Sequence, residues 1–354
     1  MPEFEPIKKK GVKKKKQTVA QSLFPCKGDS TGEVIRKIVF LLAILTLIGA
    51  TAVIIWFYFI RTDNLNKEME EIQSYRNPSS TDVISISVDV INNDGTTEQK
   101  EVTILEEYAK YYEINPDTVG YVEIYPWIGC PVVQTTDNDY YLMHNFYKEV
   151  TNFGTIFADY EVPITSESTP GNIVIYGHNL LTRNMFEPLS YYRRGLPNQS
   201  GFEFFKDNYL INFDTLYEKN QYIIFAVFLT NTTENWGEVF KYQNCVNFGT
   251  KKEFDSYVAE CLDRSYYYSG IDLEYGDELI TLSTCDFSCL SEMRMVIVAR
   301  KLRSNESPIL DTDTFIDNSD YDENGRLKRK MCEAYGVPWA GRQWDTAWIK
   351  NFEE

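Results

Sequence analysis

The clearest feature of the hydrophobic pattern is an uninterrupted apolar run near the start of the chain. Residues 38–60, IVFLLAILTLIGATAVIIWFYFI, contain no charged side chain. A helix rising ~1.5 Å per residue would span about 34 Å over this length, which is enough to cross a hydrocarbon core of ~30 Å. We therefore predict one transmembrane helix over residues 38–60.

A cleaved signal peptide is the alternative interpretation of an apolar run in this position. The apolar region of a signal peptide has ~7–15 residues, and a small-x-small cleavage site follows it. Here Arg61, Thr62 and Asp63 follow the run instead. This pattern favours an anchor that is retained.

Basic residues precede the apolar run. Residues 1–37 hold ten Lys and Arg against four Asp and Glu, a net charge of +6. Because basic flanks stay on the cytoplasmic side, we expect a cytoplasmic tail over residues 1–37 and a body outside the cell membrane. Attraction to the anionic inner leaflet accounts for the lysines and for their position.

The pattern changes twice before residue 117. Residues 61–103 are polar and irregular, with turn signals at 77–80 and 92–95, and they are predicted to form an extracytoplasmic stalk or linker. From Ile104 onward, apolar residues recur at spacings of three and four, which predicts a helix. Asn115-Pro116 is expected to end that helix.

Beyond Asp117, short apolar runs alternate with turn signals. The predicted strands are 121–125, 131–134, 155–158, 172–176, 222–229, 278–282 and 294–301. One amphipathic helix over residues 251–263 interrupts them, with Phe254, Val258 and Leu262 at four-residue spacing. Strands at this spacing predict a mainly β fold, a barrel or a sandwich, which the helix would cover.

The composition changes again after Leu302. Residues 304–354 form an acidic extension that contains Trp339, Trp344 and Trp348. Two interpretations remain open for these tryptophans: a short helix that packs on the barrel, or a motif that binds the cell wall or a partner. The folded domain is therefore assigned to residues 104–303.

Composition and charge narrow the class of function. The 354 residues are 43% apolar and 15% aromatic, as in a globular protein rather than a disordered one. The chain has 35 Lys and Arg against 52 Asp and Glu, a net charge of −17, so residues 38–354 carry −23. A phosphate backbone would repel such an acidic body, and we expect no nucleic-acid partner.

The seven cysteines are scattered, and only two histidines accompany them. No two cysteines have C-x-x-C spacing, and no acidic segment has the pattern of an EF-hand loop, so we expect neither a metal nor another cofactor. An odd number of widely spaced cysteines is not typical of a disulfide framework. One or two bridges in an exported domain remain open.

Three polar side chains stand at the ends of predicted strands. His178 follows the apolar run of IVIYGHNL, Cys285 ends ELITLSTC, and Arg294 opens RMVIVAR. A hairpin from Cys285 to Arg294 would bring thiol and guanidinium to the same end of a sheet. Arg300 would lie roughly 20 Å away, six residues further along.

Such a trio has a defined chemistry. A thiolate attacks a carbonyl, an imidazolium protonates the leaving amine, and a guanidinium stabilises the oxyanion. Taken singly, His178 is also explained as a hydrogen-bonded structural histidine. Cys285 is also explained as a buried free cysteine.

Six strings of the sequence, in this order, resemble the class B sortases. They are NPDTVGYVEI from Asn115, PVVQTTDNDYYLMHNF from Pro131, GTIFADY from Gly154, IVIYGHN from Ile173, TLSTC from Thr281 and RMVIVARKL from Arg294. The resemblance covers about residues 105–303, and TLSTC after GHN and before an arginine is its most specific part. Tyr121, where the family usually has Trp, and the extension after residue 303 depart from the family pattern.

The resemblance implies a fold and a reaction. Sortases are membrane-anchored cysteine transpeptidases of Gram-positive bacteria that cut a C-terminal sorting motif after its Thr and pass the acyl group to an amine. We therefore expect an eight-stranded sortase-type β-barrel with flanking helices, preceded by one transmembrane helix. By position, Cys285 resembles the nucleophile, His178 the general acid/base and Arg294 the residue that stabilises the oxyanion or the substrate.

The resemblance also implies a binding groove and partners. Asn138, Leu142 and Ser283 match positions that line the groove for the sorting motif. The implied partners are surface proteins that carry this motif, an amine of a peptidoglycan precursor or cross-bridge, and the lipid bilayer. The sequence leaves open whether the motif is NPQTN-like, SPxTG-like or LPxTG-like.

Two alternatives to this function stay open. In the first, the accepting amine is a pilin lysine, and the enzyme polymerises pilins. In the second, the barrel is a catalytically idle scaffold, and the tryptophan-containing extension binds the cell wall.

Two further residues bear on the chemistry. Cys289 lies four residues after Cys285, and a disulfide between them would silence the nucleophile. His144, in YLMHN, falls at a position that is often polar in the family, so we expect it to be non-catalytic.

Overall fold

The computed structural model describes most of the chain. The described residues are 18–56, 61–78, 80–91, 97–166, 170–179, 184–193, 200–233, 239–286 and 293–317. They fall into two compact units, Met1–Lys67 and Glu68–Glu354. Cys289 and the three tryptophans of the acidic extension lie outside the described residues.

The first unit contains the apolar helix. α1 (Val19–Leu23) precedes α2 (Thr31–Ile55), and Ser30 caps α2 by accepting a hydrogen bond from the Glu33 N–H. Among the described residues, α2 is the one helix long and apolar enough to cross a membrane. The prediction of one N-terminal apolar helix is confirmed, although the helix begins before the predicted run, at Thr31.

The segment predicted as a linker, 61–103, contains regular structure. It holds α3 (Arg61–Ser74) and an antiparallel hairpin of β1 (Val83–Ile91) and β2 (Thr97–Leu105). In the second unit, Met69 and Ile72 of α3 are buried. They are three residues apart and therefore share one helix face, while Glu70 and Glu71 are exposed. Two apolar residues among many charged ones gave too weak a pattern for a helix prediction.

The helix predicted from Ile104 begins later. Ile104 and Leu105 pair with β1, and the helical segment consists of η2 (Glu106–Tyr108) and α4 (Ala109–Ile114). α4 ends at the residue before Asn115-Pro116, as the sequence predicts.

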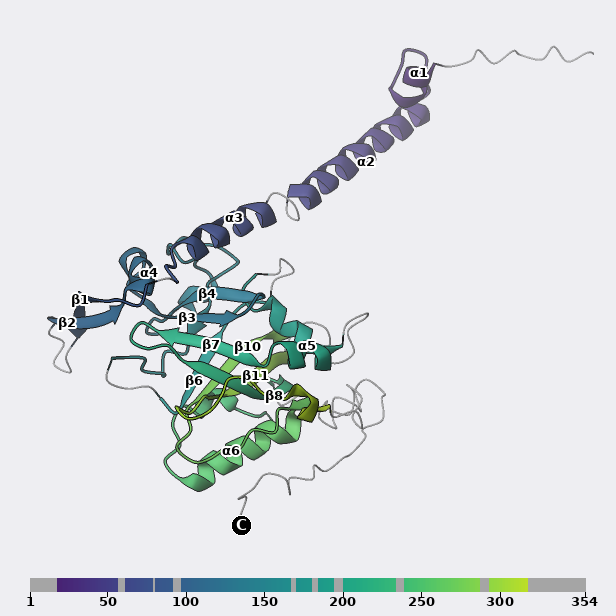
Figure 1. Ribbon diagram of the computed structural model, residues 1–354. Helices are drawn as coiled ribbons and strands as arrows, with labels where there is room; N and C mark the ends of the chain where they lie inside the picture. The colour runs from purple at the N-terminus through teal and green to yellow at the C-terminus, as the bar shows by residue number, and fades with distance from the viewer. Residues whose placement is uncertain are drawn as a thin grey trace, which may run out of the picture. The chain divides into compact units, whose positions relative to one another are not determined.

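Eight strands of the second unit close into a barrel (Figure 1). They are β3 (Thr118–Ile124), β4 (Ile128–Val133), β5 (Phe157–Ala158), β6 (Asn172–Tyr176), β7 (Leu210–Thr215), β8 (Gln221–Asn231), β10 (Leu279–Asp286) and β11 (Met293–Lys301). Their order around the barrel is β10-β11-β8-β7-β3-β4-β5-β6. The predicted eight-stranded barrel is thus confirmed.

Each run predicted as a strand corresponds to a barrel strand, and β6 has the predicted bounds. Among the barrel strands, β7 is the one that the pattern did not predict, because polar Asn212 and Asp214 interrupt its few apolar residues. β10 pairs in parallel with β6, and β4 with β5, while the other neighbours are antiparallel.

Shorter elements lie between these strands or follow the last of them. They are η3 (Tyr140–Leu142), η4 (Glu187–Tyr192), α5 (Gly201–Asp207), η6 (Tyr242–Asn244), β9 (Tyr267–Tyr268), η7 (Thr312–Thr314) and β12 (Ile316–Asp317).

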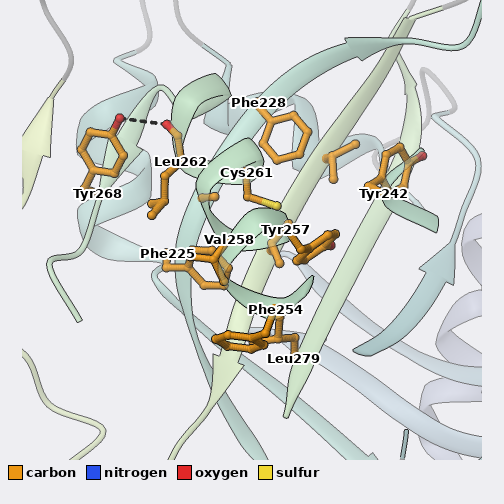
Figure 2. Close-up of a cluster of buried hydrophobic side chains, with 13 residues drawn as sticks. Phe225, Phe228, Tyr242, Phe254, Tyr257, Val258, Cys261, Leu262, Tyr268 and Leu279 are labelled. Carbon is orange, nitrogen blue, oxygen red and sulfur yellow. Dashed lines mark hydrogen bonds between the residues drawn. The ribbon is translucent and has the colours of Figure 1, made fainter. Parts of the chain in front are cut away.

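One long helix, α6 (Lys251–Arg264), covers part of the barrel and agrees with the prediction to one residue. Thr250 and Glu253 form a capping box at its start. Its buried face packs against residues of β8, β10 and β11, among them Phe228, Leu279 and Val296 (Figure 2). Cys285 and Arg294 lie beyond this cluster on β10 and β11, and both are half-buried.

The described part of the acidic extension packs on the barrel unit. Arg300, with its side chain buried, binds Glu306 at 2.6 Å. Phe315 is buried against the rings of Phe205 and Tyr209, and β12 pairs with β9. The first residues of the extension therefore belong to the folded unit.

Replacing Ile72 tests whether α3 is packed rather than a passive linker. Ile72 is 2% exposed, so Ile72→Ala should lower the free energy of unfolding of the barrel unit by about 2–4 kcal/mol. Glu70→Ala, at an exposed position of the same helix, should change it by less than about 0.5 kcal/mol. Urea unfolding of the full chain in detergent measures both, and equal values would contradict the packing.

Candidate active site

The pairings of β10 with its two neighbours bring three candidate residues to one end of the barrel. Across the antiparallel pair, Cys285 lies directly opposite Arg294. Across the parallel pair, Ser283 lies opposite Tyr176. Two residues further along each strand, the same register places Cys285 beside His178.

Hydrogen bonds continue that parallel register past the last ladder pair. Gly177 N–H donates to the Ser283 carbonyl at 3.2 Å, and the Thr284 hydroxyl donates to the Gly177 carbonyl at 2.7 Å. The Asn179 amide donates to the Cys285 carbonyl at 2.7 Å. The residues on both sides of His178, Gly177 through its backbone and Asn179 through its side chain, are therefore tied to the strand that carries Cys285.

The six candidate residues line a single cavity of about 480 Å³. They are Cys285, His178, Arg294, Asn138, Leu142 and Ser283. The structure therefore brings together every site residue that the sequence singled out.

Further polar residues line the same cavity, although the sequence pattern did not predict them as site residues. They include Asp159, Tyr176, Thr284, Gln243 and Asn244. The first three lie inside the strings GTIFADY, IVIYGHN and TLSTC, where they had no distinguishing chemistry. Gln243 and Asn244 belong to η6 and lie outside every string, so only the fold could place them.

One face of β10 and β11 changes from apolar to polar along its length. Leu279, Val296 and Val298 are buried under α6. The Ser283 hydroxyl then shares a 2.6 Å hydrogen bond with the buried Tyr242. Cys285 and Arg294 follow on the same face, where the cover of α6 has ended, and both are half-buried.

A backbone carbonyl fixes the protonation pattern of the His178 ring. Nε2 lies 2.9 Å from the Leu142 carbonyl oxygen. Because a carbonyl can only accept, Nε2 carries a proton, and Nδ1 is the nitrogen left to exchange one. Leu142 therefore contributes its backbone to the site as well as its place in the cavity wall.

Gly154 permits this close approach. Its φ is +63°, and a Cβ here would lie 2.6 Å from the Tyr141 carbonyl, 2.9 Å from the Leu142 carbonyl and 2.8 Å from Cδ2 of His178. Only glycine fits both the backbone conformation and the space.

Residues of α3 lie behind this segment. Met69 and Ile72 border a small void together with Gly154 and Phe146. The Asn145 amide donates to Glu68 at 2.9 Å. α3, which lies in the segment predicted to be a linker, thus packs against the chain around Leu142, whose carbonyl binds the His178 ring.

The two arginines of β11 have separate environments. Arg294 Nη1 donates to the Met293 carbonyl at 3.0 Å, and its side chain lines the cavity. Arg300 pairs in register with Leu279 and binds Glu306 through both terminal nitrogens. The preference for Arg294 over Arg300 near Cys285 agrees with this geometry.

The other histidine and two of the other described thiols have structural surroundings. His144 stacks on Tyr140 with ring centroids 4.0 Å apart, and its Nδ1 lies 2.7 Å from the Tyr140 carbonyl. Cys130 and Cys261 are buried, and burial raises the pKa of the Cys130 thiol to about 12. Cys285 is a free, half-buried thiol, and among the described cysteines it is the one that lines the cavity. Within the described ranges, no group of three or more His, Cys, Asp or Glu side chains is arranged to hold a metal ion.

Comparison with known proteins identifies the domain that contains this cavity. The model of the sortase domain matches residues 132–302, which contain all six candidate residues. The chain therefore contains a sortase domain over these residues, the domain of a family of cysteine transpeptidases. The resemblance seen in the sequence is thereby confirmed.

This sortase is similar to proteins named sortase B. Sortase B of Listeria monocytogenes is 28% identical over 232 residues, which cover 65% of this chain and 88% of that protein. Sortase B of Staphylococcus aureus is 25% identical over 197 residues, which cover 55% and 74% of the two chains. A crystal structure from Bacillus anthracis, described as similar to sortase B, superposes with a TM-score of 0.51 at 27% identity and covers 68% of this chain and 96% of its own.

Substituting Gly154 tests how tightly the chain at Tyr141 and Leu142 is packed beside the His178 ring. Gly270 provides a matched control, since its φ is +73° and no atom lies within 4 Å of a Cβ built there. Gly270→Ala should cost about 1–2 kcal/mol of stability from the backbone conformation alone. Gly154→Ala should cost at least about 2 kcal/mol more, because the new methyl meets two carbonyls and the His178 ring. Urea unfolding measures both variants, and equal losses would contradict the crowding.

Proposed function

We propose that this sortase is a class B transpeptidase that cleaves the C-terminal sorting motif of surface proteins after its Thr. The acyl group passes through a thioester at Cys285 to an amine of the cell wall. One observation carries the proposal: the register of β10 with β6 and β11 brings a thiol, an imidazole and a guanidinium to one cavity.

In the proposed first step, the Cys285 thiolate attacks the carbonyl carbon of the Thr residue. Negative charge develops on the carbonyl oxygen, and the Arg294 guanidinium stabilises it. His178 gives a proton from Nδ1 to the leaving amine as the peptide bond breaks, and a thioester remains on Cys285.

In the proposed second step, an acceptor amine attacks the thioester. His178 takes a proton from the amine, the thiolate leaves, and a new amide bond forms. The acceptor is proposed to be an amine of a peptidoglycan precursor or cross-bridge. Asn138, Leu142 and Ser283 are proposed to hold the sorting motif, since they line the same cavity as Cys285.

The proposed location follows from the charge around α2. Basic residues precede the apolar helix, and the body that follows it is acidic. We propose a single-pass anchor with residues 1–37 in the cytoplasm and the barrel outside the cell. The extracellular barrel would meet both secreted substrates and the wall amine.

A peptide assay tests the proposed function. The full chain in detergent would be mixed with quenched peptides of the NPQTN, SPxTG and LPxTG types, with and without triglycine or a cross-bridge amine. The wild type should cleave one type after its Thr and join it to the amine, while Cys285→Ala should do neither. Absence of cleavage by a reduced, folded wild type across the panel would contradict the proposal.

Replacing Arg294 tests the oxyanion role. Arg294→Ala should lower kcat by about 10²–10³-fold, as expected when one group that stabilises the oxyanion is lost. Arg294→Lys should recover only part of the rate, because an ammonium keeps the charge but not the planar fork. Lys301→Ala, on the same strand but bound to Glu218 and Glu278, serves as the control. An Arg294→Ala rate equal to that of the control would remove Arg294 from the mechanism.

A further inference from the structure

Asp159 is a buried carboxylate in the wall of the cavity that holds Cys285 and His178. It follows β5 directly and is 4% exposed. Its N–H donates to the Val174 carbonyl at 2.9 Å, so its backbone is held against β6. Neither the sequence pattern nor the reaction steps above give this residue a role.

Three neutral donors satisfy the carboxylate. Oδ2 accepts from the Tyr176 hydroxyl at 2.7 Å and from the Asn138 amide at 3.1 Å. Oδ1 accepts from the Glu161 N–H at 3.0 Å. Among the described residues, Asp159 forms no ion pair with any Lys, Arg or His. A buried charge without a counter-ion is costly, and its hydrogen bonds must offset that cost.

The Asn138 side chain is held from both ends. Its amide nitrogen donates to Asp159, and its amide oxygen accepts from the Tyr160 N–H at 3.1 Å. A carboxylate can only accept, so the nitrogen of Asn138 must face Asp159, and the amide cannot turn over. One N–H and one oxygen lone pair of Asn138 remain unused by these two bonds.

The unused N–H and the unused oxygen lone pair of Asn138 match the hydrogen-bonding groups of a peptide backbone. An extended peptide offers one C=O acceptor and one N–H donor per residue. The free N–H and the free lone pair of Asn138, in a fixed orientation, suit one acceptor and one donor of such a chain. Burial and the nearby Asp159 also raise the pKa of the Tyr176 hydroxyl, so this group stays protonated and keeps donating to the carboxylate.

We infer that Asp159 is a positioning residue for the substrate: by fixing the orientation of the Asn138 amide, it presents one donor and one acceptor to the backbone of the sorting motif. This inference rests on the proposed function, because it assigns the cavity to a peptide. Asp159 acts on substrate binding through Asn138 and takes no part in the chemical step.

Asp159→Asn is a sharp test because it conserves shape. The three donors are divided between two carboxylate oxygens, whereas an amide has a single acceptor atom. In either orientation, the amide introduced at position 159 leaves at least one donor unpaired. When its nitrogen faces Asn138, the bond from the Tyr160 N–H is the one of the two holding bonds that remains. KM for the sorting peptide should rise about 10-fold or more, with kcat changed by less than about 3-fold.

The control and the direct binding measurement use the same protein. Asp139→Asn removes a carboxylate next to Asn138 from an exposed position, and it should leave KM within about 2-fold of the wild type. All measurements use the full chain in detergent and the peptide that the wild type cleaves. In a Cys285→Ala background, Asp159→Asn should weaken the binding of the labelled peptide by the same factor as KM.

Exchanging the carboxylate and the amide between positions 159 and 138 separates a positioning role from a purely structural one. Asn138→Asp combined with Asp159→Asn restores one carboxylate and one amide in contact, so the melting temperature should return towards the wild-type value. Position 138 can then no longer donate to a substrate, and KM should stay high. Recovery of both the melting temperature and KM in the swap would overturn the positioning role.

Two other outcomes have different meanings. If the wild type cleaves a peptide and Asp159→Asn leaves its KM and its binding unchanged, the inference about Asp159 is wrong while the proposed function stands. If the reduced, folded wild type neither cleaves nor binds any peptide of the panel, the proposed function fails, and the role of Asp159 fails with it.

Discussion

The register of β10 is the constraint on which the rest of the site depends. This strand is paired on both edges, antiparallel to β11 and parallel to β6, so neither edge can move without breaking a ladder. A shift of one residue would turn the Cys285 side chain to the opposite face of the sheet. The two ladders therefore determine both where the thiol lies and which groups it faces. Hydrogen bonds from the Gly177 N–H and the Asn179 side chain extend this control past the end of the ladder, to the residues on either side of His178.

The same strand must be stable under α6 and reactive at its end. The buried polar side chains of β10 have hydrogen-bond partners. Thr281 forms a hydrogen bond with the hydroxyl of Tyr257, and Ser283 forms one with the hydroxyl of Tyr242. These bonds allow polar residues on a buried face without the cost of unpaired groups. The apolar cluster around Phe254 and Val258 stabilises the strand against which it packs (Figure 2). Beyond the helix, the strand carries Cys285 into the cavity.

Local pattern and alternation predicted much of this arrangement. The apolar runs of β6 and β11 and the four-residue spacing of α6 are strong signals, because burial acts on those residues directly. The pairing of Cys285 with Arg294 follows from a hairpin and the period of two. The position of His178 was harder to predict, since it meets Cys285 through a parallel pairing between segments about a hundred residues apart. Its place in the site came from the family resemblance. Asp159 and the packing of Met69 depend on tertiary contacts that no local pattern encodes.

In the proposed reaction, Cys285 carries the acyl group between two substrates. This role can be tested by the intact mass of the full chain, quenched during turnover with a sorting peptide and no added amine. We expect a mass gain equal to the acyl part of the peptide. After proteolysis, the gain should map to the fragment that contains Cys285, and hydroxylamine should release it. An unmodified chain during active cleavage, or an adduct on another cysteine, would rule out a thioester at Cys285.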